Sequence, residues 1–511
     1  MKFIHTMRTD RWFSFLLAVL CASAFAGNNH PLIDAVKSQD ATATRTLIDQ
    51  KTDVNLPQGD GATALHWAVH RDDLEIAEVL IDAGANVDAT NDFGIMPLAL
   101  ACANRNAAMA ELLLNSGADA NAARLTGETL LMTAAFAGDL GVVNALLRND
   151  ADVNIAEPVR QQTALMWAIG EGHTDVAMSL VEHGADVHAK TTLDFTPLLF
   201  AARAGDLKIS KVLLDQGADV NAIAKYRDSQ TYLAERDPEN DEGKKGLSVL
   251  QVATHRGHAD VAMYLLERGA DPNYDGPGYT ALHWAVTSWE TELDGINGFT
   301  APKSHEWSRM SGMQEGKMEL VQALIDHGAD INAPLQSNPS RYGFTVTSTR
   351  PKGSTPYALA AMAADANMMR LLVKNGADPT LIPVNGVPPL LWAAGVNRHT
   401  AENIATENES LEAVKVAVEH GADINTTDKS QNTALHGAAW IRSPKIVQYL
   451  VDNGADVNAK NKFQLSALDI ATTDGRLAGV PGPFIESSPV VDLLLELSDE
   501  RVIKKAFRKK P

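Results

Sequence analysis

Residues 58–90 read QGDGATALHWAVHRDDLEIAEVLIDAGANVDAT and contain the pattern that decides the fold. Thr63 can cap a first helix, because its hydroxyl accepts a bond from an otherwise unpaired backbone N–H. A second helix follows, with apolar residues at helical spacing from Ile76 to Ile81. Gly84 ends this helix, because glycine adopts the left-handed conformation without a Cβ clash. The stretch therefore predicts one helix–turn–helix unit.

Two phrases of this unit recur along the chain in a constant register, at intervals that are often 33 or 34 residues. One is Gly-Ala-Asp or Gly-Ala-Asn, and it begins at Gly84, Gly117, Gly184, Gly217, Gly269, Gly328, Gly376, Gly421 and Gly454. The other contains a leucine, called the phrase leucine below, at Leu65, Leu98, Leu131, Leu165, Leu198, Leu250, Leu282, Leu390, Leu435 and Leu468. This period predicts stacked helical repeats, because one unit alone cannot bury its apolar faces.

The second phrase is most complete as Thr-Ala-Leu-His at 63–66, 280–283 and 433–436. With the Gly-Ala-Asp phrase it makes the chain similar to ankyrin-repeat proteins over nearly all of residues 30–497. The resemblance implies an all-α ankyrin-repeat solenoid of about 11–12 helix-turn-helix units with short β-hairpin-like turn fingers. It also implies that the histidine of the phrase bonds between neighbouring turns, and that the chain binds other proteins.

The N-terminal residues predict export. Lys2, Arg8 and Arg11 precede a short apolar run, and Ala24-Phe25-Ala26 is a small-x-small cleavage signal before Gly27. We expect a periplasmic or secreted protein without membrane insertion after signal cleavage. The alternative is an uncleaved anchor, although the apolar run is short for a membrane span.

The rest of the chain divides around the repeats. The insertions fall in its second half, and insertions in solenoids map to loops that are often on a binding face. The segment at 498–511 is either a cap or a basic docking tail. We expect a signal peptide at 1–26, a capping repeat at 27–57, regular repeats at 58–223, a charged insertion at 224–246, and repeats at 247–497 with inserted loops at 288–316, 335–353, 397–410 and 473–487.

Charge and cysteine content limit the partners and the chemistry. The net charge of −20 becomes −22 without residues 1–26, which hold three basic residues and one acid, so we expect no nucleic-acid partner. Without Cys21 the chain keeps only Cys102, which predicts a packed, inert thiol. No phosphate-binding loop, nucleophile elbow or Cys-x-x-Cys pair is present. We therefore predict no catalytic residue, cofactor or metal site.

The resemblance implies that two positions of each repeat face a partner protein. The position five residues after the phrase leucine faces the concave groove, and the position three residues before it faces the partner from the turn finger. Large apolar residues at these positions predict contacts with a partner protein, which could be a periplasmic enzyme that the chain supports or regulates. These residues are Ile95, Phe136, Phe195, Leu247, Tyr279, Val387 and Trp440.

The loop at 288–316 supports an alternative function. Trp289 and Trp307 are unusual in a flexible linker, so the loop either packs back on the repeats or contacts a partner. The same loop could serve a small-ligand sensor or an enzyme. In contrast, Trp67, Trp167, Trp284 and Trp392 follow the phrase leucine by two residues, and we expect them in the core.

Overall fold

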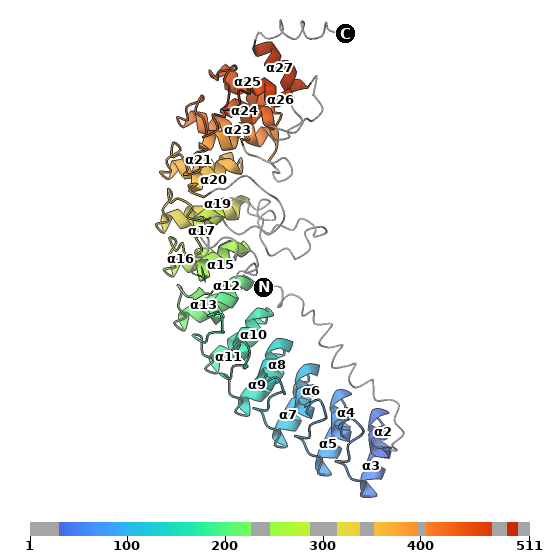
Figure 1. The fold of residues 1–511 in the computed structure, drawn as a ribbon. Coiled ribbons are helices and arrows are strands. Elements are labelled where there is room, and N and C mark those ends of the chain that lie inside the picture. Colours follow the sequence, from blue (N-terminus) through green and yellow to red (C-terminus); the bar gives the residue numbers. More distant parts are fainter. Residues whose placement is uncertain are drawn as a thin grey trace, which may run out of the picture. The chain divides into compact units, whose positions relative to one another are not determined.

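The structure is a computed structural model that describes residues 30–225, 246–286, 314–337, 352–396, 405–472 and 488–498. In these ranges the chain forms twelve helix pairs, each with a first and a second helix (Figure 1). The first helices are α2 (Pro31–Lys37), α4 (Ala64–His70), α6 (Pro97–Asn104), α8 (Leu130–Ala137), α10 (Ala164–Gly170), α12 (Pro197–Ala204), α15 (Val249–Arg256), α17 (Ala281–Ala285), α20 (Pro356–Met362), α22 (Pro389–Ala393), α24 (Ala434–Trp440) and α26 (Ala467–Thr472). The second helices are α3 (Ala41–Asp49), α5 (Leu74–Asp82), α7 (Ala107–Asn115), α9 (Leu140–Arg148), α11 (Thr174–Glu182), α13 (Leu207–Asp215), α16 (Ala259–Glu267), α19 (Gln314–Asp326), α21 (Ala366–Lys374), α23 (Glu407–Glu419), α25 (Pro444–Asp452) and α27 (Pro489–Leu497).

The helices belong to two compact units. Of the described residues, 30–225 and Leu247–Val252 form the first unit, and Gly246 with the residues from Ala253 onward forms the second. In the first unit α6 packs on α4, α7 and α8. In the second unit α22 packs on α20, α23 and α24. Each unit is thus a stack in which first helices contact first helices and second helices contact second helices (Figure 1).

The histidine of the Thr-Ala-Leu-His phrase joins neighbouring repeats, as the resemblance implies. Its Nδ1 accepts the backbone N–H of Thr63 at 3.1 Å, so its Nε2–H donates to the carbonyl of Ile95 in the next repeat at 3.0 Å. His283 and His436 repeat this arrangement with Ala333 and Leu465. The phrase therefore caps its own helix and holds the next repeat with one side chain.

The second helices begin and end as their residue types dictate. Aspartate caps several of them; the carboxylate of Asp73, for example, accepts the N–H of Ile76 at 3.0 Å, next to the positive end of the helix dipole. Gly84 follows the helix with φ of +90°, as we predicted. Asp150 replaces glycine in one repeat and keeps the left-handed conformation, with φ of +60°.

The turn that joins a second helix to the next first helix is called a finger here. Adjacent fingers are joined by backbone hydrogen bonds, such as Asp92 N–H to Asp60 O at 2.9 Å and Thr192 N–H to Arg160 O at 3.0 Å. One finger contains the antiparallel strands β1 (Ile223–Ala224) and β2 (Leu247–Ser248). Backbone hydrogen bonds therefore hold several neighbouring fingers side by side.

The core lies between the helices of neighbouring repeats. The phrase leucines are buried, with Leu65 and Leu282 fully enclosed. Trp67, Trp284 and Trp392 expose 8%, 6% and 2% of their surface, which confirms their predicted core position, whereas Trp167 is half-buried.

Two predicted boundaries differ from the structure. Helix α19 begins at Gln314 and α23 begins at Glu407, so the ends of the expected loops 288–316 and 397–410 are helical. Thr406 and Glu409 form a capping box that starts α23. Ser498 follows the last residue of α27. Segments 1–26 and 473–487, most of the charged insertion at 224–246 and residues 499–511 lie outside the described residues.

Candidate partner-binding surface

In each unit the predicted contact residues lie on the first helices and on the fingers that precede them, and we call this surface of a unit the first-helix face. Phe136 lies near the end of α8, and Trp440 is the last residue of α24. Both side chains are half-buried. The position five residues after the phrase leucine therefore anchors an aromatic ring in the repeat and leaves part of it accessible.

Aromatic rings contact one another between and within the first helices of the first unit. The rings of Phe136 on α8 and Trp167 on α10 meet edge to face with centroids 5.6 Å apart. Within α4, Trp67 and His70 make a similar contact at 5.7 Å. Edge-to-face pairs stabilise the packing beyond their burial, so these rings are held in defined orientations.

Cationic side chains lie over two aromatic rings of the first unit, those of Trp67 and Phe200. The Lys37 ammonium is 4.4 Å from the ring centroid of Trp67, and the Arg203 guanidinium is 5.0 Å from that of Phe200. Phe200 also contacts Phe195 of its own finger edge to face at 5.8 Å. The first-helix face thus combines aromatic rings with positive charge, although the whole chain is acidic.

The other predicted contact residues divide into two groups. Ile95, Phe195 and Leu247 are half-buried on their fingers, so each presents part of its side chain. Tyr279 and Val387 expose only 9% and 6% of their surface, which corrects the expectation that they are accessible to a partner. The loop residues Trp289 and Trp307 lie outside the described residues.

Tyr279 is enclosed because it belongs to an aromatic cluster in the second unit. The ring of His255 contacts those of Tyr279 and Trp284, with centroid distances of 5.5 and 3.9 Å, and the Tyr279 and Trp284 rings also contact each other at 5.6 Å. Burial lowers the pKa of His255 to about 3, so this ring is neutral. His255 occupies the position five residues after its phrase leucine, but the sequence did not reveal this stack, which requires the next repeat to pack against it.

A ladder of asparagines that the sequence analysis missed connects the outer turns of neighbouring repeats. The amide of Asn154 donates to Gly184 O at 3.1 Å and accepts Asp186 N–H at 2.7 Å. The ladder residue is the asparagine two positions after the aspartate in the phrase Gly-Ala-Asp-x-Asn or a close variant of it, which was the available signal. The same two bonds are made by Asn55, Asn121, Asn273, Asn332 and Asn425.

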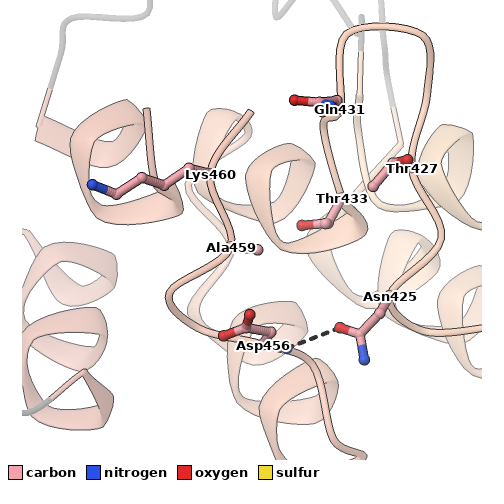
Figure 2. Close-up of a pocket in the computed structure, with 7 residues that line it drawn as sticks. All are labelled: Asn425, Thr427, Gln431, Thr433, Asp456, Ala459 and Lys460. Carbon is pink, nitrogen blue, oxygen red and sulfur yellow. Dashed lines mark hydrogen bonds between the residues drawn. The ribbon is translucent and has the colours of Figure 1, made fainter. Parts of the chain in front are cut away.

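A polar cavity of about 520 Å³ lies beside one rung of this ladder (Figure 2). Figure 2 shows Asn425 directed toward Asp456, whose N–H it accepts at 2.9 Å. The cavity is also lined by Thr427, Gln431 and Lys460, which lie on the same two fingers as Asn425 and Asp456. The cavity is open and mostly polar, and its asparagine already serves the ladder, so we assign it no ligand.

The described residues offer little for catalysis or metal binding. Within them no group of three or more His, Cys, Asp or Glu side chains is placed to hold a metal ion. Burial raises the pKa of Cys102 to about 12, so its thiol stays protonated. Among the helices that the structure describes, none has the length and hydrophobicity that a bilayer crossing needs.

Three known proteins illustrate the likeness of this chain to others. It is 28% identical over 200 residues to Alpha-latrocrustotoxin-Lt1a of Latrodectus tredecimguttatus, covering 38% of this chain and 11% of the toxin. It is 30% identical over 128 residues to Putative ankyrin repeat protein FPV240 of Fowlpox virus (strain NVSL), covering 24% of this chain and 28% of that protein. It is 37% identical over 143 residues to human BCL-6 corepressor-like protein 1, covering 28% of this chain and 6% of that protein. The matches thus span only a minor part of each relative.

A solved structure and two family models also match the chain. The human ASB11 ankyrin repeat domain is similar over its whole length and 48% of this chain, at 28% identity and a TM-score of 0.39. A family model described as "Ankyrin repeats (3 copies)" matches residues 15–91, 32–124, 84–157, 131–224, 226–296 and 394–461, and one described as "Ankyrin repeat" matches 277–334. Because these matches cover more than half of the sequence, the chain belongs to the ankyrin-repeat family.

Proposed function

We propose that this chain is a scaffold that binds a partner protein on its first-helix face, outside the cytoplasm. The observation that carries the proposal is the set of half-buried aromatic side chains on that face, Phe136, Phe195 and Trp440. Large aromatic residues that are anchored but partly accessible are typical centres of binding energy in protein interfaces.

The architecture suits binding without rearrangement. Phe136 and Phe195 are each braced by another ring, and the repeats are joined by His66-type and asparagine hydrogen bonds. Because the scaffold is already ordered, it loses little conformational entropy when a partner docks, and this favours affinity. The cations at Lys37 and Arg203 would favour acidic groups at the edge of the partner.

The location and the kind of partner complete the proposal. The N-terminal residues, with basic residues before an apolar run and Ala24-Phe25-Ala26 after it, support export to the periplasm or the exterior. The partner that we propose is a periplasmic enzyme that the scaffold supports or regulates, by resemblance to exported bacterial ankyrin proteins.

Affinity capture with crosslinking tests this proposal. Residues 27–511 would be used to capture proteins from an extracytoplasmic extract of the host, and crosslinked peptides would be identified by mass spectrometry. We expect one dominant protein crosslinked near Phe136 or Trp440. Phe136→Ala should reduce its recovery by about tenfold or more, because loss of an interface anchor costs about 1.4 kcal/mol or more.

Phe93→Ala is the matched control, because it removes the same side chain from a fingertip where Phe93 is 51% exposed. Circular dichroism would confirm that both variants remain folded. Undiminished capture by folded Phe136→Ala and Trp440→Ala variants would exclude the first-helix face as the binding surface.

A further inference from the structure

One finger of the second unit exposes an unusual group of apolar side chains. The finger at 375–388 exposes 38% of Leu381, 59% of Ile382 and 76% of Val384. In the part of the chain that the structure describes, every other finger exposes at most one large apolar side chain. The first-helix-face position of this finger, Val387, is enclosed, so the exposed group is a separate surface. Three apolar side chains on one turn indicate an interaction site.

The neighbouring fingers hold this turn in place. Val384 lies so close to Gly353 of the preceding finger that an added Cβ there would be 2.8 Å from its own Cβ. On the other side, Lys429 Nζ donates to the carbonyl of Val384 at 2.7 Å, and the methylene groups of this lysine lie against Gly386. The apolar side chains are therefore presented on a fixed backbone.

Lysines occupy the matching positions on the next two fingers. Val384, Lys429 and Lys462 each lie six residues before the third residue of the capping phrase, in three consecutive repeats. Lys460 has the repeat position that Ile382 has on the apolar finger. All three lysines are exposed. Lys460 and Lys462 form no ion pair with the described residues, so their charges are available to a partner.

The ends of these three fingers carry a positive charge, although the whole chain carries −20. We call residues 380–386, 425–431 and 458–464 together the tip surface. It holds three lysines and one acid, Asp428, which is a net charge of +2. Asp428 is half-buried, and its carboxylate already accepts the backbone N–H of Ser430 at 2.8 Å. The tip surface therefore attracts anionic groups.

The outer turns of the same fingers hold three more acids, which bring the complete fingers, 375–388, 420–433 and 453–466, to a net charge of −1. These acids are Asp378, Asp423 and Asp456, and each accepts the backbone N–H two residues further along the chain. Figure 2 shows Asp456 beside Asn425 at the opposite end of the fingers from Gln431, which belongs to the tip surface. The positive charge is thus concentrated at the tips.

Apolar side chains beside exposed lysines match the chemistry of an anionic phospholipid surface. Aliphatic groups enter the boundary between head groups and acyl chains, while ammonium groups stay among the phosphates. An acidic peptide would need a groove, and the cavity beside Asn425 is mostly polar, so it offers no place for apolar side chains. A fluid bilayer, in contrast, adapts to the shape of protruding turns.

We propose that the tip surface docks this chain on an anionic phospholipid membrane, with Ile382 and Val384 in the head-group boundary and the lysines on phosphate groups. The chain then lies on the membrane and does not cross it. The inference goes beyond the proposed function, because it concerns other residues than Phe136, Phe195 and Trp440. One apolar turn and three charges give weak, reversible and salt-sensitive attachment.

Sedimentation with lipid vesicles tests the proposal. Residues 27–511, the form used for capture, lack the apolar run at 12–20, which could bind lipid by itself. We expect this form to bind vesicles of phosphatidylglycerol and phosphatidylcholine in equal parts at least about tenfold more strongly than vesicles of phosphatidylcholine alone, because each lysine near an anionic surface contributes about fivefold. Added sodium chloride should weaken the binding to the anionic vesicles.

A pair of double variants tests the apolar contribution. Ile382→Ser with Val384→Ser should lower the partition coefficient at least about tenfold, because two large side chains no longer leave water. Leu125→Ser with Val159→Ser is the matched control, since these residues of the first unit are 82% and 74% exposed, and Val159 has the same repeat position as Val384. The control should bind like the parent.

A pair of single variants tests the charge. Lys460→Gln should lower the binding to anionic vesicles about fivefold. Lys374→Gln is the matched control, because Lys374 is exposed at the end of α21, outside the tip surface, and should leave the binding unchanged. Circular dichroism would confirm that all variants are folded.

Three results would overturn the proposal: equal binding to vesicles with and without phosphatidylglycerol, binding insensitive to the tip variants, or an equal loss in the control variants. Binding to soluble poly-glutamate but not to vesicles would also overturn it, and would make an acidic protein the occupant of the tip surface. Capture experiments on the first-helix face use other variants, so their outcome is separate from these results.

Discussion

The asparagine ladder makes a quantitative prediction about how the repeats hold together. In Asn154→Ala, the carbonyl of Gly184 and the N–H of Asp186 both lose their side-chain partner. A hydrogen bond contributes about 0.5–1.5 kcal/mol net, which gives about 1–3 kcal/mol for the pair. Gly184 and Asp186 are exposed, and water can replace part of the loss, so we expect about 1–2 kcal/mol.

One repeat of the chain has a ladder position that makes only one of the two hydrogen bonds. Asp88 occupies the ladder position in one repeat and accepts Asp119 N–H at 3.0 Å, but a carboxylate has no N–H to donate to the carbonyl of Gly117. Asp88→Asn would complete the rung and reduce repulsion between neighbouring acids. We expect it to raise the free energy of unfolding by about 0.5–1 kcal/mol. Conversely, Asn154→Asp should lose about half as much stability as Asn154→Ala.

Hydrogen exchange with mass spectrometry measures this effect locally, and urea unfolding measures it globally. In Asn154→Ala, peptides that contain Asp186 should exchange about 5- to 30-fold faster than in the parent chain, since 1.4 kcal/mol is a factor of ten. Asn115→Ala, at an exposed helix end, is the control. The ladder explanation fails if Asn154→Ala exchanges and unfolds like the parent, or if Asp88→Asn is destabilising.

Three further outcomes follow from the packing. Burial lowers the pKa of His283 from 6.5 to about 4. As the pH falls, the unfolded chain therefore binds a proton before the folded chain does. The contribution of His283 to the free energy of unfolding is complete above pH 6.5 and falls on the order of 3 kcal/mol by about pH 4. His283→Gln should remove that share of the pH dependence in urea unfolding, since Gln251 already replaces the histidine in one repeat and accepts Ser248 N–H. In Gly127→Ala the added Cβ would lie 2.5 Å from Pro158, whereas Gly84 has a similar positive φ but open space around it. We expect Gly127→Ala to lower the free energy of unfolding by about 1–3 kcal/mol more than Gly84→Ala does, measured by calorimetry. In a Cys21→Ser background, Cys102 should react with maleimide only at urea concentrations that unfold the chain, because its thiol is buried and its pKa is about 12; labelling of the folded protein would contradict this.

Local chemistry repeated in register determined the fold from the sequence alone. Thr63 as a cap, Gly84 as a left-handed stop and the leucine at position 65 each have a local physical cause, and their recurrence predicted both the helix pairs and the stacking. The core positions of Trp67, Trp284 and Trp392 followed from the same register. Non-local contacts between repeats were implied only for the histidines, through the family resemblance.

Tertiary structure decided which side chains are accessible, because exposure depends on the neighbouring repeat and not on the residue's own position. Tyr279 occupies a nominally exposed position, yet His255 and Trp284 enclose it. Leu125 and Val159 sit in polar turns that carry no apolar periodicity, so their exposure on neighbouring fingers is visible only in the folded repeats. The asparagine ladder likewise needs two repeats at a fixed distance. The sequence specified one repeat well, whereas the surfaces available for binding arise from the packing of one repeat on the next.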